Sequence, residues 1–93
     1  MRGPEGLRRE VVIVNRLGLH ARAAARFVKL AERFDARIRV IKDDLEVAGT
    51  SILGLMTLAA SPGVTLELRA VGAEAGPAIE ALVALVARGF DEE

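Results

Sequence analysis

The chain has 93 residues, of which 52% are hydrophobic, and this length suits one small domain that spans residues 1–93. Cysteine is absent, which excludes disulfide bonds and thiolate metal sites and favours a reducing, cytoplasmic setting. Thirteen basic residues balance thirteen acidic ones, and Tyr and Trp are missing, so the composition argues against a nucleic-acid partner.

The sequence predicts a soluble protein without membrane insertion. Its opening residues lack the apolar run of a signal peptide. The long uncharged stretch that starts at Val47 and stops before Glu67 is interrupted by glycine and proline residues. A membrane-spanning helix needs an uninterrupted apolar segment, so this stretch is not expected to cross a bilayer.

The first part of the chain predicts a strand and an amphipathic helix. Val11–Val14 is a β-branched run that suits a strand over residues 10–15, and residues 1–9 are expected to form a flexible N-terminal extension. From His20 to about Phe34 the hydrophobic spacing becomes helical. Apolar residues fall on one face and basic residues on the opposite face: Ala24, Phe27, Val28, Ala31 and Phe34 against Arg22, Arg26, Lys29 and Arg33.

The middle of the chain predicts a β-hairpin followed by a short helix. Residues 37–42 alternate between apolar and polar, and an Asp-Asp turn leads to a returning strand over residues 45–47. A second helix is expected over about residues 51–59. Gly49 or Thr50 is expected near its N-cap.

The last part predicts a strand, a loop and a third helix. Residues 64–71 alternate regularly, and Pro77 closes a loop over residues 72–77 in a position suited to a first helical turn. Gly89 is placed to end the third helix, and residues 91–93 are expected to form a solvated tail. The core face of this helix is predicted to contain Ile79, Leu82, Val83, Val86 and Phe90.

The predicted element order is therefore β-α-β-β-α-β-α. Alternating strands and one local hairpin favour an α+β open-faced sandwich: a four-stranded, mainly antiparallel sheet covered on one face by three helices. Folds of this kind host many unrelated functions, so the function has to be inferred from individual residues.

The residues with the clearest chemistry lie where the first strand leads into the first helix. The segment Asn15–Arg22 reads NRLGLHAR and contains the only histidine, His20. The first N–H groups of a helix have no internal acceptor, and together with the helix dipole they form an anion site. Arg22 adds a guanidinium suited to phosphate oxygens. These parts fit phosphoryl transfer, although a histidine that merely caps a helix would have the same local setting.

Two segments resemble motifs of the HPr family of histidine-containing phosphocarriers. Gly18–Arg22 (GLHAR) is similar to the family's phosphorylation motif, and Asn15 precedes it at the usual distance. Residues 49–58 (GTSILGLMTL) resemble the segment that holds the family's regulatory serine and short helix. The likeness runs from about Glu10 to Phe90 and includes the β-α-β-β-α-β-α order.

The resemblance implies that His20 accepts a phosphoryl group through its Nδ1 atom. The donor would be enzyme I, charged by phosphoenolpyruvate, and the acceptors would be IIA domains of sugar permeases. Such a carrier forms a phosphohistidine intermediate, is not a self-contained enzyme, and has no metal and no organic cofactor of its own. Arg22 would steady the phosphate, and Asn15 would help to fix the loop and the ring.

Three small residues are expected to support the phosphate site: Gly18, Ala21 and Ala23. Ala21 brings no side-chain hydroxyl that could compete beside His20. The family usually has proline directly after the motif arginine, whereas this chain has Ala23. Alanine restores a backbone N–H, which could either add a donor for the phosphate or loosen the first turn.

The second motif implies regulation and docking. Ser51, in the first turn of the short helix, would be a target of an HPr kinase/phosphorylase, and a catabolite regulator is a further expected partner. From the residues alone, a serine that only helps to start the helix is the alternative interpretation. In the family an apolar patch on this helix docks both partners, although Ile52 in the core is an alternative. The patch would consist of Ile52, Leu53 and Met56.

Two other functions are considered as alternative hypotheses. One is an HPr-like regulatory phosphoprotein of a nitrogen-type or catabolite-control phosphotransfer chain. The other is a small ligand- or RNA-binding module, although the lack of aromatics counts against RNA. A self-contained enzyme is not predicted, because the single histidine has no cysteine or acidic pair beside it. A carrier that must expose His20 to two partners is expected to be a monomer.

Overall fold

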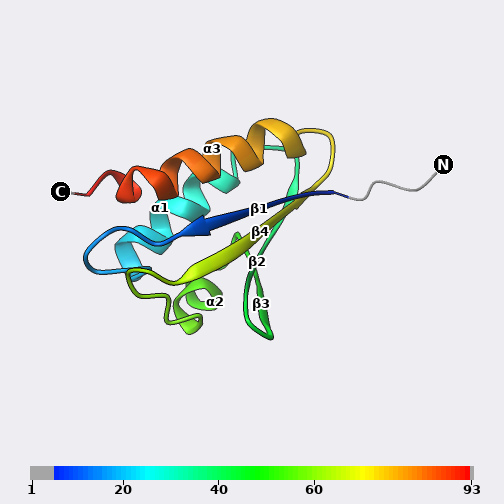
Figure 1. Ribbon diagram of the computed structural model, residues 1–93. Helices are drawn as coiled ribbons and strands as arrows, with labels where there is room; N and C mark the ends of the chain where they lie inside the picture. Colours follow the sequence, from blue (N-terminus) through cyan, green and yellow to red (C-terminus); the bar gives the residue numbers. More distant parts are fainter. Residues whose placement is uncertain (1–5, 93) are drawn as a thin grey trace.

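The computed structural model describes residues 6–92 of the chain. The elements follow the predicted order, and Figure 1 shows the sheet with its helices packed to one side. In chain order they are β1 (Leu7–Val12), α1 (Ala21–Ala31), β2 (Arg37–Lys42), β3 (Leu45–Ala48), α2 (Ile52–Thr57), β4 (Thr65–Val71) and α3 (Ala75–Ala87), followed by a 3₁₀ turn (Gly89–Asp91).

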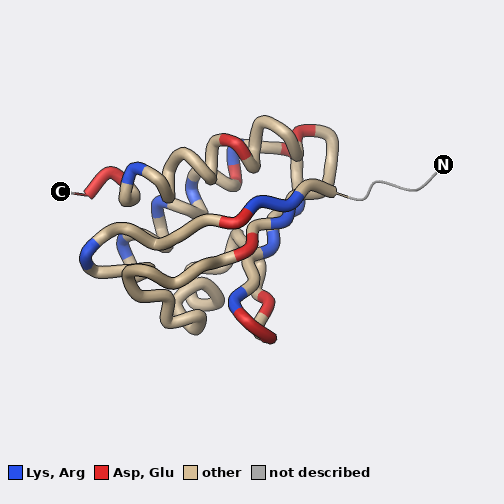
Figure 2. The backbone as a smooth tube through the Cα atoms, in the orientation of Figure 1, with Lys and Arg blue, Asp and Glu red and all other residues tan. Residues whose placement is uncertain are grey.

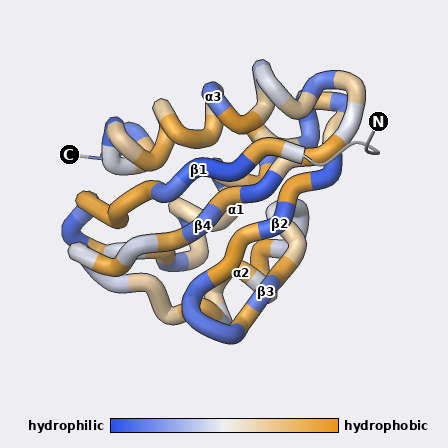
Figure 3. The backbone as a smooth tube through the Cα atoms, turned by 45° about the vertical axis from the view of Figure 1, so that its right-hand side comes forward, coloured by the Kyte–Doolittle hydropathy of each residue, from blue (hydrophilic) through white to orange (hydrophobic). Residues whose placement is uncertain are grey.

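The four strands form one open sheet in the spatial order β1-β4-β2-β3. Every neighbouring pair is antiparallel, which confirms the predicted α+β open-faced sandwich. Val11 pairs with Leu66 and Val40 pairs with Leu68, so buried side chains oppose one another on the helix side of the sheet. Figure 3 shows the hydrophobic and hydrophilic alternation along these strands.

The opposite face of the sheet is polar and open. Glu67 on the central strand β4 accepts from Arg69 at 2.7 Å and lies 3.6 Å from Arg8 on β1. Charged residues line these strands in Figure 2, whereas α2 carries none. Among the helices and strands of residues 6–92, α2 is thus the element without a charged side chain.

The hydrophobic core lies between the sheet and the helices. The helix α3 packs on β1 and β4, and α1 contacts both α2 and α3. The predicted apolar face of α1 is buried up to Ala31, and Phe34 beyond the helix is half-buried. The largest fully buried side chains are Ile13, Val40, Leu55, Leu58, Leu68, Ile79, Leu82, Val86 and Phe90.

The first strand starts earlier than the sequence indicates. It covers Leu7–Val12 instead of residues 10–15, because its register with β4 runs from Leu7, opposite Ala70, to Val12, opposite Thr65. Residues 7–9, which the sequence placed in an N-terminal extension, are thus part of the sheet. Residues 1–5 of that expected extension lie outside the described residues.

The first two helices are shorter than their hydrophobic spacing predicts. The helix α1 ends at Ala31, since residues 32–34 form a turn. The N-cap of α2 is Ser51 instead of Gly49 or Thr50, because the Ser51 hydroxyl accepts from the Gly54 N–H at 2.9 Å. The same helix ends at Thr57, just before Ala59 takes a left-handed φ of 49°.

The third helix begins earlier than predicted. It starts at Ala75, so Pro77 is the third helical residue, where its missing N–H costs no internal hydrogen bond. Gly89 follows the helix with a φ of 69°, which confirms the predicted end. Within residues 6–92, no helix has both the length and the apolar character to cross a membrane.

Candidate functional site

The loop before α1 is shaped by Gly18. This residue has a φ of 68°, and a side chain added there would collide with the Ala60 carbonyl. The next residue, Leu19, donates its N–H to that same carbonyl at 2.9 Å. The loop is thereby pinned to the segment after α2, and only glycine satisfies both the conformation and the close approach.

His20 is the N-cap of α1. Its backbone is extended, with φ −81° and ψ −179°, and its Nδ1 accepts from the Arg22 N–H at 3.3 Å. The ring therefore directs an Nδ1 lone pair at the first amides of the helix, where an anion is also favoured. The side chain is 26% exposed, which leaves it within reach of a partner.

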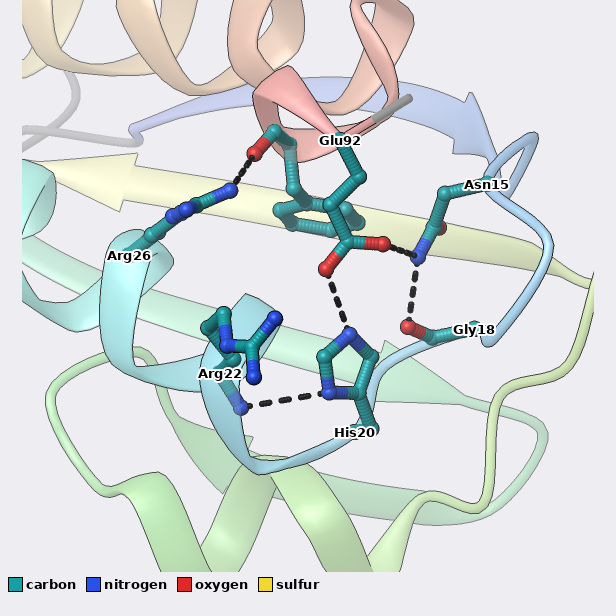
Figure 4. Close-up of polar contacts among 7 residues, drawn as sticks. Asn15, Gly18, His20, Arg22, Arg26 and Glu92 are labelled. Atoms are coloured by element: carbon teal, nitrogen blue, oxygen red, sulfur yellow. Dashed lines mark hydrogen bonds and ion pairs between the residues drawn. The ribbon is translucent and has the colours of Figure 1, made fainter.

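The other ring nitrogen of His20 contacts Glu92 (Figure 4). The His20 Nε2–H donates to Glu92 Oε2 at 2.5 Å, which together with the Nδ1 contact assigns the hydrogen to Nε2. The prediction of a solvated tail over residues 91–93 is therefore wrong for Glu92, whose side chain is only 14% exposed. Glu93 lies outside the described residues.

Asn15 connects the loop to Glu92. Its Nδ2 donates to the Gly18 carbonyl at 2.8 Å and to Glu92 Oε1 at 2.9 Å. Its Oδ1 is buried without a hydrogen-bond partner among residues 6–92, so the two Nδ2 contacts set the orientation of the amide. The expectation that Asn15 fixes the loop thus has a geometric basis, and its contact with the ring runs through Glu92.

The turn after α3 holds Glu92 in place. Phe90, in a left-handed conformation with a φ of 58°, buries its whole side chain and reverses the chain toward α1. Its carbonyl accepts from Arg26 Nη1 at 2.6 Å, and Asp91 pairs with Arg88 at 2.8 Å. The sequence places Arg26 on the basic face of α1 opposite the core, but the residue is half-buried and ties α1 to the C-terminal turn.

The surroundings of Glu92 favour its ionised form. The Asn15 hydrogen bond lowers the pKa of Glu92 most, and the His20 contact and the positive charge of Arg26 lower it further. Partial burial opposes these effects but does not outweigh them. The carboxylate is therefore negative at neutral pH.

Arginines surround the outer side of this cluster. Arg22 is exposed and, with Arg16 and Arg26, lines an open hollow of about 490 Å³ that also includes Glu92. Guanidinium groups bind phosphate oxygens well, so the hollow can accept an anion next to His20. No group of three or more His, Cys, Asp or Glu suited to a metal ion occurs within the described part of the chain.

Residues 7–88 match a protein family described as "PTS HPr component phosphorylation site". The chain belongs to the HPr phosphocarrier family. Phosphocarrier protein NPr of Shewanella violacea is 43% identical over 86 residues, covering 92% of this chain and 94% of that one. Phosphocarrier protein HPr of Neisseria meningitidis is also 43% identical over 86 residues, with 92% and 97% covered.

Solved structures give the same assignment. The crystal structure of HPr-C-His from Thermoanaerobacter tengcongensis superposes with a TM-score of 0.89 at 42% identity, covering 94% of this chain and 98% of that one. The family assignment sets aside the hypothesis of an unrelated ligand- or RNA-binding module. It confirms a phosphocarrier of the phosphotransferase system.

In this HPr-family chain two small residues after His20 place their backbone N–H groups at the start of α1. Ala21 and Ala23 are the first and third residues of α1, so their N–H groups belong to the four that a helix leaves without internal acceptors. The side chain of Ala23 is fully buried in the core, and the first turn is intact with alanine at this position.

The second HPr motif forms a cap and an exposed apolar surface. The Ser51 hydroxyl is partly buried as the cap of α2, while Leu55 and Leu58 are buried in the core. Ile52 does not join the core: it is 39% exposed, beside Leu53 at 77% and Met56 at 40%. We call these three residues, Ile52, Leu53 and Met56, the α2 patch.

Sequence reasoning missed two members of the site, Glu92 and Arg26. The only signal for Glu92 was indirect: Phe90 follows Val86 at core spacing but comes after Gly89, so the chain had to turn back to bury it. The sequence did bring together Asn15, Gly18 and His20, which the structure places in one hydrogen-bonded cluster with Glu92.

Proposed function

We propose that this chain takes a phosphoryl group from enzyme I onto His20 Nδ1 and passes it to IIA domains. The observation that carries the proposal is the position of Nδ1, which accepts the Arg22 N–H at the start of α1. The Nδ1 lone pair, the first backbone amides of α1 and an arginine-lined hollow then lie side by side.

In the transfer step, phosphorus exchanges its bond to the donor for a bond to the His20 ring. The Nδ1 lone pair attacks phosphorus, the bond from phosphorus to the donor breaks, and its electron pair leaves with the donor. The hydrogen stays on Nε2, so the ring becomes positively charged. The phosphoryl oxygens then replace Nδ1 as acceptors for the first amides of α1, and Arg22 lies close enough to neutralise part of their charge.

The partners and the pathway are part of the proposal. The NPr and HPr relatives are equally similar to this chain, at 43% identity each, so similarity does not separate a nitrogen-type chain from a sugar-transport chain. We favour the sugar-transport role and keep the nitrogen-type or catabolite-control role as the alternative. The monomeric state stays a prediction.

The direct test is acceptance and donation by the wild-type chain. After incubation with phosphoenolpyruvate and a cognate enzyme I, intact mass should show one added phosphoryl group that is lost in acid. The label should then move to a IIA domain, and comparing sugar-specific with nitrogen-type IIA domains distinguishes the pathways. Failure to gain the label from either type of enzyme I would contradict the carrier function.

The α2 patch is proposed as the docking surface for both partners. Replacing Leu53 by glutamate should raise the KM for enzyme I about tenfold, because a central apolar anchor becomes charged. The side chain is 77% exposed, so folding should change little. The matched control is Leu45→Glu, a 45% exposed leucine on β3, which should leave the KM unchanged. Equal KM values for the two variants would contradict docking at this patch.

Ser51 is proposed as a regulatory phosphorylation site. Its hydroxyl caps α2, and a phosphate there would add about two negative charges beside the docking patch while its oxygens could still accept from Gly54. Incubation with ATP and an HPr kinase/phosphorylase should label wild type and Ser61→Ala but not Ser51→Ala. Loss of the cap should also lower the unfolding free energy of Ser51→Ala by about 1 kcal/mol. Labelling of Ser51→Ala would contradict the assignment.

A further inference from the structure

Glu92 has both carboxylate oxygens engaged by donors of the candidate site. One oxygen accepts from the His20 ring and the other from the Asn15 amide. Phe90 anchors the turn that presents Glu92, and Arg26 holds the carbonyl of Phe90. The fold therefore holds the Glu92 carboxylate at the site through a buried aromatic side chain and a hydrogen-bonded backbone carbonyl.

We propose that Glu92 is a positioning residue for phosphoryl transfer, which fixes the His20 tautomer and stabilises the positive ring formed when Nδ1 bonds to phosphorus. This inference rests on the proposed function of His20. The carboxylate does not accept the Nε2 hydrogen as a proton. It holds the hydrogen on the ring while Nδ1 uses its lone pair, which is the role a carboxylate has beside a catalytic histidine in hydrolases.

The geometry separates the two negative groups. Glu92 contacts Nε2, and the phosphoryl group would occupy Nδ1 at the other side of the ring. The nearby charged groups are Arg16 from the loop, Arg22 and Arg26 from α1, and Asp91 from the turn. Three positive charges against one further negative charge limit the repulsion between the carboxylate and the incoming phosphate.

Glutamine cannot take the place of Glu92. Both neighbours, the His20 Nε2–H and the Asn15 Nδ2, are hydrogen-bond donors, whereas a glutamine side chain has one acceptor oxygen and one donor NH₂. Either the His20 ring or the Asn15 amide would then face the NH₂ donor of the glutamine. The Glu92→Gln variant therefore keeps the size of the side chain but loses both the charge and one hydrogen bond.

The test compares Glu92→Gln with Glu80→Gln. The second variant makes the same chemical change on α3, at an exposed side chain that pairs with Arg9 instead of His20. With phosphoenolpyruvate and enzyme I, Glu92→Gln should accept phosphoryl groups roughly tenfold more slowly than wild type, the effect expected for one hydrogen bond to a charged group. Glu80→Gln should match wild type.

A pH profile separates this role from a structural one. The phosphorylated ring hydrolyses faster when Nε2 keeps its hydrogen, so Glu92 should move the pH midpoint of hydrolysis upward. The midpoint in Glu92→Gln should lie about one pH unit lower than in wild type, which is the same tenfold effect on a pH axis. If Glu92 only held the C-terminal turn and did not act on the ring, the midpoint would be the same in both proteins.

The outcomes distinguish the two proposals. If wild type and both variants accept phosphate equally fast with the same hydrolysis midpoint, the role of Glu92 is wrong and the carrier function stands. If wild type itself is never phosphorylated, the carrier function fails. In that case the ring contact is tested separately, by ¹⁵N NMR of the unphosphorylated protein. Faster exchange of the Nε2 hydrogen in Glu92→Gln than in wild type supports the positioning role of Glu92. Equal exchange in the two proteins overturns it.

Discussion

Replacing His20 by alanine will abolish phosphoryl acceptance. The chain has no second histidine and no cysteine, so no other side chain at the start of α1 offers a nitrogen or sulfur nucleophile. Intact mass after incubation with phosphoenolpyruvate and enzyme I should show the added group on wild type and no trace on His20→Ala. Ser51→Ala should keep full labelling, because Ser51 lies outside the hydrogen-bonded cluster of the ring.

The same substitution should leave the fold in place. His20 caps α1 through a 3.3 Å contact with the Arg22 N–H, and loss of such a cap costs about 1 kcal/mol. Circular dichroism and urea unfolding of His20→Ala therefore serve as the control for loss of function. Acid-labile phosphate on His20→Ala would show that the acceptor has been misassigned.

Truncating Phe90 to alanine should cause the largest loss of stability. Its side chain is fully buried, and removing a buried aromatic ring costs about 3–5 kcal/mol. Urea unfolding of Phe90→Ala should show a lower midpoint with little change in slope. Phe34→Ala is the matched control: the same atoms are removed from a half-buried position, so the loss should be clearly smaller.

Phe90 should also matter for the site. It anchors the turn between Gly89 and Glu92, and its carbonyl accepts from Arg26. If Phe90→Ala folds at low temperature, its ring–carboxylate contact should weaken, and phosphoryl acceptance should slow as in Glu92→Gln. A Phe90→Ala protein as stable as Phe34→Ala would contradict the assignment of Phe90 to the core.

Most of the fold follows from hydrophobic periodicity. Strands that alternate, such as β4, place Leu66, Leu68 and Ala70 toward the helices as their pattern predicts. The element bounds follow less well, since they depend on partners that lie far away in the sequence. The start of β1 at Leu7 is set by its register with Ala70, and nothing local to Leu7 indicates that pairing.

The candidate site was predictable where its residues are close in sequence. Asn15, Gly18 and His20 lie within six positions, and their roles follow from a turn that leads into a helix. Glu92 comes from the other end of the chain, and its approach depends on Phe90 and Asp91 in left-handed conformations that non-glycine residues seldom adopt. Propensity alone therefore indicated a solvated tail.

The central claim is that Nδ1 of His20, and not Nε2, carries the phosphoryl group. The most direct measurement is the coupling between ³¹P and ring ¹⁵N in the uniformly ¹⁵N-labelled chain after phosphorylation by enzyme I. Coupling to Nδ1, with the hydrogen still on Nε2, is the predicted result, because Nε2 is held by Glu92. Coupling to Nε2 would mean that the Glu92 contact breaks during transfer, and it would contradict the account of this site.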